Sequence, residues 1–371
     1  MNFLLFKCIL KCGAICALFL SSSVAASGPC TDAVFGVAAV KVDQTADTAS
    51  KARDIGANRA AETAFTTMLR RILVDPAAMT AFVEAGKFDQ YLDFVHIVEE
   101  KNLDKRYIAT LDFCFDAARV RDALMTAGLR WAELQSPNIL VMPVWRSPDG
   151  VRAWHKENKW ITGWWDAVAA HDGLLTLRIL PRNLINERRF KGEDLAAGLP
   201  QTLALAATVA AAEQILVVQA AMDFNLGVPE VGVSSRLYDK YGALITEVDK
   251  MEPIRLSSPE PPELAAVRDQ IIGRIGHSWQ TANLIDGQSL GEMMVRVPAS
   301  SLQSWTDRLN ALDKVAVIMS YDIVALDTTG GLLRIRLAGS RQALQNALAA
   351  QKLQLVEEEG QLLITSNFGQ S

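Results

Sequence analysis

The first part of the chain switches between the two hydrophobic periods that distinguish strands from helices. Residues 33–43 (AVFGVAAVKVD) form an apolar run typical of a strand, whereas in 48–73 small and large apolar residues recur every three or four positions, which predicts a helix with a narrow face. Residues 91–116 then predict a hairpin, and 116–129 a second helix. This order accounts for most of a ferredoxin-like split βαβ module, expected over residues 30–135.

The middle of the chain has a different pattern. Residues 138–146 (NILVMPVWR) and 215–224 (ILVVQAAMDF) are continuous apolar runs, as expected for strands that are buried on both faces. The intervening stretch predicts two helices separated by a strand, and 231–248 predicts a hairpin. Alternating strands and helices indicate a mixed-sheet α/β domain over residues 137–285.

The last segment, 290–371, returns to the pattern of the first. It reads as strand, helix, hairpin, helix and closing hairpin, and the second hairpin strand alternates Leu333, Ile335 and Leu337 with arginines. The predicted fold class is therefore α+β with α/β: two ferredoxin-like split βαβ modules flanking a mixed-sheet α/β domain.

The amino terminus indicates export. Residues 1–26 hold Lys7 and Lys11, no acidic residue, an apolar run and a small-residue end, which predicts a signal peptide cleaved after Ala26 and a periplasmic protein. An uncleaved anchor is the alternative, although the apolar run after Lys11 is only about 15 residues and a span needs about 20. No later segment is expected to span a membrane.

The composition of the chain limits the classes of partner that can be expected. Half of the residues are hydrophobic, enough for each module to bury a core, and the formal net charge is −5. Without a clustered basic stripe, an acidic chain has no broad attraction for phosphate backbones, so nucleic acid is not an expected partner.

Two cysteines remain after the predicted signal peptide. In a split βαβ module the start of the first strand lies beside the end of the third, where Cys30 and Cys114 fall. An oxidising compartment would favour a disulfide between them, the alternative being two buried, unbonded thiols.

Candidate reactive groups are sparse. Gly287-Gln288-Ser289-Leu290-Gly291 fits the nucleophile motif G-x-S-x-G, but a helix precedes it and a strand follows, the reverse of what the mechanism requires. His171 lies beside Asp172, yet neither it nor His155 has an assignable nucleophile. We therefore expect no catalytic residue, no metal and no cofactor.

Tryptophans concentrate in one stretch, residues 152–165 (RAWHKENKWITGWW), with Trp145 just upstream. One interpretation is a structural wedge packed on the sheet, with Trp160 and Trp164 one helical turn apart and Trp145 and Trp154 in the preceding loop. The other is a peptide or glycan platform. The candidate binding residues are Trp145, Trp154, His155, Trp160, Trp164 and Trp165.

Three stretches carry a family resemblance. Residues 40–73, 106–116 (RYIATLDFCFD) and 138–145 (NILVMPVW) resemble the exported bacterial proteins catalogued as domain of unknown function 2066. That resemblance implies an uncharacterised envelope protein and carries over no catalytic residue. Separately, 139–145 and 236–245 are similar to strands in the amino-terminal domain of the Tol-Pal propeller protein, although no propeller pattern follows them.

The sequence therefore favours a non-enzymatic periplasmic interaction or assembly factor that binds another envelope protein. Its expected surfaces are the 145–165 region and the sheet edges of the terminal modules, which could accept a strand. The alternative is an enzyme or a small-ligand or glycan receptor acting on cell-wall material in an interdomain cleft. Buried indoles and an exposed edge would favour the first, and a pocket gathering Trp154, His155 and carboxylates the second.

Overall fold

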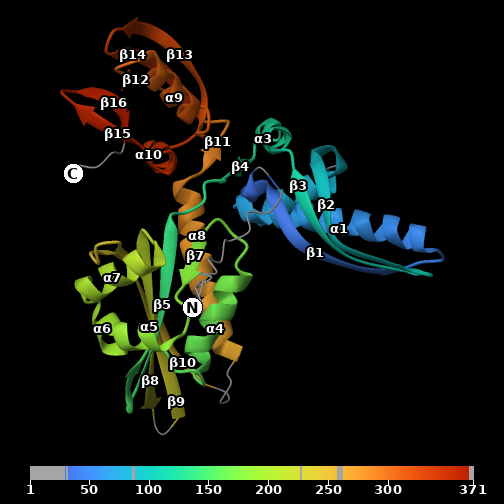
Figure 1. Ribbon diagram of the computed structural model, residues 1–371, viewed down its shortest axis with the longest axis vertical. Helices are drawn as coiled ribbons and strands as arrows, with labels where there is room; N and C mark the ends of the chain where they lie inside the picture. Colours follow the sequence, from blue (N-terminus) through green and yellow to red (C-terminus); the bar gives the residue numbers. More distant parts are fainter. Residues whose placement is uncertain (1–29, 31, 86–87, 226–227, 257–261, 367–371) are drawn as a thin grey trace, which may run out of the picture.

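Three lobes, each built around one sheet of three or more strands, make up the described part of the protein (Figure 1). The computed structural model describes residues 30, 32–85, 88–225, 228–256 and 262–366, so the predicted signal peptide lies outside the described residues. We refer to the lobes as the N-terminal, middle and C-terminal modules. In the described part of the chain, no helix is both long enough and apolar enough to cross a membrane.

The N-terminal module is a three-stranded antiparallel sheet with helices on one face. The strand order is β1-β3-β2, so the first strand lies antiparallel beside the third, as expected. A complete ferredoxin-like sheet has a fourth strand, which is not part of this one. The elements are η1 (Ala33–Phe35), β1 (Gly36–Thr45), α1 (Ala49–Ile72), α2 (Pro76–Ala85), η2 (Phe88–Tyr91), β2 (Leu92–Leu103), β3 (Arg106–Phe115) and α3 (Ala117–Thr126).

Small residues let α1 lie close against the sheet. Thr48 caps its first turn by accepting a hydrogen bond from the Lys51 amide, and Ala52 and Ala64 are fully buried. At Gly56 a Cβ would lie 2.6 Å from Val42 Cγ1, so only glycine fits there without a shift. The long helix therefore runs along the sheet and forms the arm seen in Figure 1.

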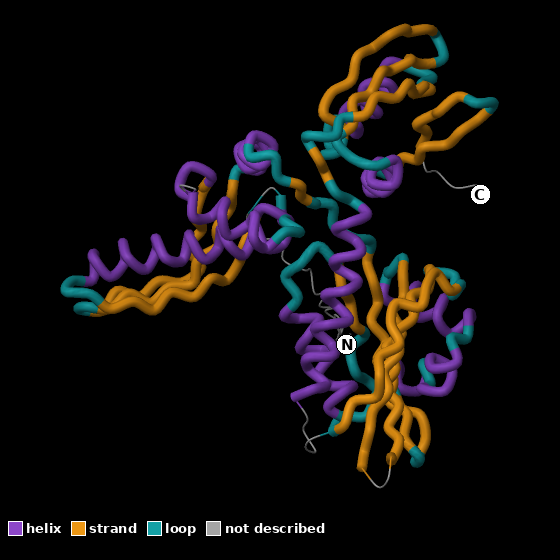
Figure 2. Tube along the Cα trace, turned by 180° about the vertical axis from the view of Figure 1, so that it is seen from behind, coloured by secondary structure: helices purple, strands orange, loops and turns teal. Residues whose placement is uncertain are grey.

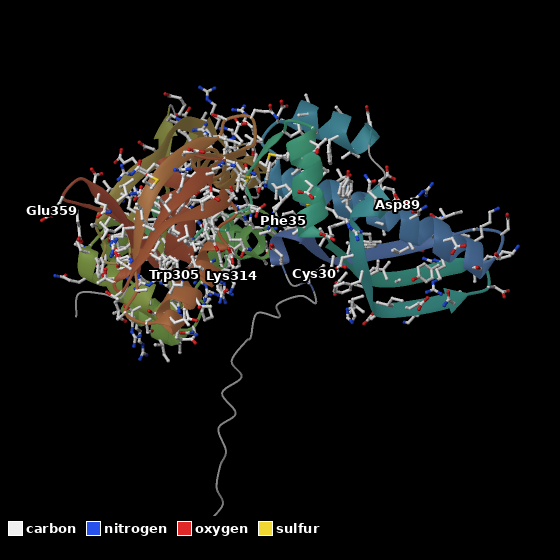
Figure 3. The ribbon with its side chains drawn as sticks, turned by 90° about the horizontal axis from the view of Figure 1, so that it is seen from above. Cys30, Phe35, Asp89, Trp305, Lys314 and Glu359 are labelled. Atoms are coloured by element: carbon white, nitrogen blue, oxygen red, sulfur yellow. A yellow bond between two sulfur atoms is a disulfide. The ribbon has the colours of Figure 1, made fainter. Side chains whose placement is uncertain are left out.

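The predicted disulfide is present between Cys30 and Cys114, whose Cα atoms are 5.4 Å apart. It ties the segment before β1 to the end of β3, and a Cβ at Gly36 would lie 2.6 Å from Cys30 Sγ. Figure 3 places Cys30 and Phe35 where the N-terminal module meets the rest of the molecule. The bond therefore fixes the base of the arm.

The middle module is a mixed sheet covered on both faces. β5 is parallel to β7 and β8, while β9 and β10 continue the sheet in antiparallel pairing. Ile139 and Val141 face α4 and α8, and Leu140 and Met142 face the helices α5–α7. The elements are β5 (Asn138–Ser147), β6 (Gly150–Arg152), α4 (Lys159–Ala170), β7 (Thr176–Ile179), α5 (Leu184–Arg189), α6 (Gly192–Ala197), α7 (Pro200–Ala210), β8 (Gln214–Asn225), β9 (Val228–Asp239), β10 (Leu244–Arg255) and α8 (Pro262–Ala282).

The C-terminal module has a five-stranded sheet of order β13-β14-β12-β16-β15. Leu333, Ile335 and Leu337 are buried, which confirms their predicted alternation. The closing hairpin places β16 beside β12, with which it pairs in parallel. The elements are β12 (Gly291–Pro298), α9 (Leu302–Leu312), β13 (Ile318–Asp327), β14 (Gly330–Leu337), α10 (Arg341–Ala350), β15 (Leu353–Glu358) and β16 (Gln361–Ser366).

A two-stranded sheet joins the terminal modules. β4 (Arg130–Trp131) pairs with β11 (Ile285–Asp286), and Trp131 is buried in one hydrophobic core that extends through both terminal modules. The long helix α8 runs from the middle module to this junction, as Figure 2 shows from behind. There Trp279 Nε1 donates to the Leu134 carbonyl at 2.7 Å. All three modules therefore meet at the end of one helix.

Removing the disulfide tests its contribution to stability. The Cys30→Ala/Cys114→Ala double variant should lose about 4–5 kcal/mol of unfolding free energy, because the bond joins residues 84 positions apart and so closes a long loop in the unfolded chain. Urea unfolding of the oxidised protein and the variant measures the difference. Equal midpoints would contradict a stabilising role, and reduced wild-type protein should match the variant.

Candidate functional site

The tryptophan-rich helix α4 directs its two central indoles into the core. Asn158 caps the helix, and Trp160 and Trp164 are both fully buried, with ring centroids 5.6 Å apart in an edge-to-face pair. Trp160 Nε1 lies 3.4 Å from the Val218 carbonyl of β8. These two residues therefore pack α4 on the sheet and offer no surface to a ligand.

The other aromatic candidates are partly exposed. Trp145 belongs to β5, where it pairs with Arg152 of β6, so the expectation that it lies in a loop was wrong and the predicted strand 138–146 is the part that formed. Trp154 donates to the Phe190 carbonyl at 2.7 Å and packs beside Trp165. His155 keeps a buried Nδ1 without a hydrogen-bond partner. None of the six candidates lines the two cavities described next.

A buried arginine, which the sequence analysis missed, connects the N-terminal and middle modules. The Arg71 side chain is only 6% exposed. Its Nη1 donates to the carbonyls of Ala33, Val34 and Gly36, its Nε donates to the Asp172 carbonyl, and its Nη2 pairs with the Asp172 carboxylate. The last turn of α1 is therefore held both to the segment after Cys30 and to the loop between α4 and β7.

Two adjoining cavities lie around this ion pair. The larger, of about 490 Å³, is formed where α1, α4 and α8 meet, and the smaller, of about 360 Å³, lies toward Cys30. Both are lined by Arg71, His171, Asp172 and Gly173. The joint between the two modules is thus a cleft bridged by one charged pair.

His171 and Asp172 do not form the kind of pair in which a carboxylate orients a histidine that acts as a base. Asp172 directs its carboxylate to Arg71, while His171 Nε2 is buried without a hydrogen-bond partner. Burial, and secondarily the Arg71 charge, lowers the pKa of His171 below its ordinary value, against an opposing effect of Asp172. The imidazole is therefore held neutral at the joint.

A histidine and a carboxylate that are distant in sequence do meet elsewhere. His96 Nδ1 lies 3.2 Å from Asp112 Oδ2 across the β2–β3 pair, and Asp112 also accepts the Ala39 amide at 2.8 Å. Predicting this pair required the hairpin register, which the hydrophobic pattern did not give. Within the described residues, no group of three or more His, Cys, Asp or Glu side chains could hold a metal ion.

The G-x-S-x-G string forms the turn between β11 and β12. Ser289 donates its amide to the Asp286 carbonyl, and a Cβ at Gly287 would lie 1.7 Å from Met125 Sδ. Close packing therefore explains Gly287, and the turn lacks the strand-to-helix geometry that an activated serine needs.

In each terminal sheet one edge strand exposes several large apolar side chains and the other edge strand does not. On β2 the side chains of Phe94, Val95, Ile97, Val98 and Leu103 are all about 40–50% exposed, and on β13 those of Met319, Ile323, Val324 and Leu326 are similarly uncovered. At the opposite edges, β1 exposes Lys41, Asp43 and Thr45, and β15 exposes Gln354, Glu357 and Glu358. Charged residues occur on all of these edge strands, so the exposed large apolar side chains are what distinguish β2 and β13 from the opposite edges.

Comparisons with known proteins add little. No family model and no curated protein matches the chain. Among solved structures it is similar to the lipoprotein GNA1162 from Neisseria meningitidis, with 16% identity over 38% of this chain and 96% of that one, at a TM-score of 0.25. A likeness of this extent carries no information on function.

Truncating the indoles separates packing from binding roles. Trp160→Ala should lower the unfolding free energy by about 3–5 kcal/mol, because it empties a fully buried site. Trp154→Ala, at a partly exposed position, should lower it by less than half as much. Denaturant unfolding of both variants measures this, and equal losses would contradict the packing role of α4.

The neutral His171 predicts a pH dependence of stability. Because its pKa is lower in the folded than in the unfolded chain, the unfolded state binds the proton more readily, and stability falls as the pH drops below about 6.5. Between about pH 7.5 and about pH 5.5, wild-type protein should lose more unfolding free energy than His171→Gln. Identical pH profiles would contradict this assignment.

Proposed function

We propose that the protein is a non-enzymatic envelope protein that binds an extended segment of another envelope protein along the free edge of β2. The single observation that carries the proposal is the contrast between the two edges of the N-terminal sheet, of which only β2 exposes a row of large apolar side chains. Such a row favours strand addition, in which backbone hydrogen bonds supply affinity and side-chain contacts supply specificity.

Charge suggests the chemistry of the bound segment. β2 carries Asp93, Glu99 and Glu100 but only one lysine, Lys101. β13 is likewise acidic, with two aspartates and no basic residue. Pairing either edge with a second copy would bring net-acidic strands together, which is unfavourable. The proposed partner segment is therefore extended, alternately apolar and basic.

Export supports the proposal from a separate direction. The disulfide is of the kind that persists in oxidising compartments, and residues 1–26 have the pattern of a signal peptide. The resemblance to the exported family of unknown function is consistent with a periplasmic location. The burial of Trp160 and Trp164 also weighs against a binding platform on α4.

Site-specific photocrosslinking in intact cells tests the proposal. A crosslinking residue at Val98 should form an adduct with a different protein, and the same residue at Thr45 on the β1 edge should not, because that edge is polar. In the Val98 background, Ile97→Lys should reduce the adduct at least about tenfold by placing a charge in the strand interface. Thr45→Lys is the matched control and should leave the adduct unchanged.

Two outcomes would contradict the proposal. Equal adducts from Val98 and Thr45 would show contact unrelated to the apolar edge. An adduct with twice the mass of the chain, formed by the purified protein alone, would show that the edge binds a second copy. Ile97 is about two-fifths exposed, so its replacement by lysine should leave the unfolding free energy nearly unchanged.

A further inference from the structure

The larger cavity at the joint has the size and construction of a ligand site. Its volume of about 490 Å³ falls in the range typical of small-molecule pockets. Three elements build it: Thr67, Arg70 and Arg71 come from α1, Ala167 and Ala170 from α4, and Gly273, Gly276 and His277 from α8. None of these residues belongs to the proposed strand-binding edge.

Arg71 provides a buried donor that the protein does not use fully. A guanidinium has five N–H groups. The Nε proton and the two on Nη1 have carbonyl acceptors, whereas Nη2 has a single acceptor, the Asp172 carboxylate, in the described part of the chain. One N–H of a side chain that is 94% buried is thus left over in the wall of the cavity. An unused donor of this kind favours an acceptor supplied from outside.

The charged side chains that line the cavity are Arg70, Arg71, Asp172 and Asp269, two of each sign. Arg70, the neighbouring residue on α1, lines the same cavity and has no hydrogen bond or ion pair with the described residues. Asp172 is engaged by the Arg71 guanidinium, while Asp269 lines the same cavity from α8 and is not paired with either arginine among the described residues. A desolvated arginine beside a second, unpaired arginine is the arrangement that binds carboxylate or phosphate groups.

Two glycines in α8 have no packing reason that the structure shows. A Cβ at Gly273 would meet no atom within 4 Å, and one at Gly276 would make only an ordinary contact with Leu175 at 3.9 Å. Glycine inside a helix is less favourable than alanine, so these positions reduce the stability of α8. Gly273 and Gly276 both line the cavity, where the absence of a side chain leaves space for a ligand.

We propose that this cleft binds a small organic molecule that carries a carboxylate or a phosphate. Arg70 and the free N–H of Arg71 hold the anion, Asp269 accepts a hydrogen bond from a hydroxyl or amine of the ligand, and the organic part lies over Gly273 and Gly276. The ligand contacts both the N-terminal and the middle module. The site is independent of the strand-binding edge on β2.

Calorimetric titration of the full-length protein with three matched probes tests the site. Glucuronate and glucose 6-phosphate carry the two anions on one sugar frame, and glucose carries neither. At millimolar concentration, one or both anionic probes should bind, and glucose should bind at least about tenfold more weakly. The relative affinities of glucuronate and glucose 6-phosphate then distinguish carboxylate from phosphate. Binding of neither anionic probe, or binding equal to that of glucose, would overturn the proposal.

Two pairs of variants locate the binding. Arg70→Gln should weaken the anionic probe at least about tenfold, whereas Arg59→Gln, on the same helix outside the cavity, should not. Gly273→Ala should raise the melting temperature and weaken the probe at least about tenfold, because its methyl group strengthens the helix and occupies the cleft. Ser278→Ala, on α8 outside this cavity, should leave binding unchanged. An unaltered affinity in Arg70→Gln and Gly273→Ala would overturn the assignment.

Discussion

The desolvated guanidinium of Arg71 joins the N-terminal module to the middle module. A buried charge is tolerated only when hydrogen bonds and a counter-charge replace the lost water, and here three carbonyls, a fourth from Asp172 and the Asp172 carboxylate do so. The three carbonyls belong to residues 33–36, immediately after Cys30. The disulfide therefore fixes the acceptors on which the arginine depends, and the covalent link and the ion pair act as one joint.

The Arg71 joint lies between the hydrophobic cores of the molecule, in a region that contains cavities. The terminal modules share one hydrophobic core through Trp131, and the middle sheet has a core on each face. Between the N-terminal and middle modules, by contrast, polar contacts cross adjoining cavities. Two smaller cavities lie between the terminal modules and beside α8, and the sheet edges at β2 and β13 expose large apolar side chains. The surfaces that we propose for binding therefore lie at the joint and at the β2 edge rather than at the buried indoles of α4.

The sequence predicted the parts of the fold that have strong periodicity. The long α1, the apolar strands β5 and β8, and the alternating β14 all formed as expected, because each buries a continuous face. The Cys30–Cys114 bond followed from the predicted strand order together with the predicted oxidising compartment. The elements β4, β6 and β11, with two or three residues each, were missed because so few residues show no period, and the six-residue α5 and α6 were missed for the same reason.

The candidate site was harder to predict because its contacts cross between modules. Asp172 was judged beside its sequence neighbour His171, whereas its partner is Arg71, about a hundred residues away. A signal did exist: Arg71 falls among Met68 and Ile72 on the buried side of α1, where an unpaired arginine would be costly. A charged residue on an apolar helical face predicts a distant counter-charge but does not identify it.

On α4, the residues that pack in the core are different from the residues that line the cleft. Trp160 and Trp164 fix α4 against the sheet, and the carboxyl end of the same helix supplies Ala167, Ala170 and the loop that carries Asp172. A rigid helix thus presents small residues to the joint while its aromatic residues stay inside. Ligand contacts at the joint can change without altering the core, because the residues that stabilise α4 differ from those that line the cleft. The same separation holds in the N-terminal module, where the apolar edge of β2 lies on the far side of the sheet from β1 and from the segment that Arg71 holds.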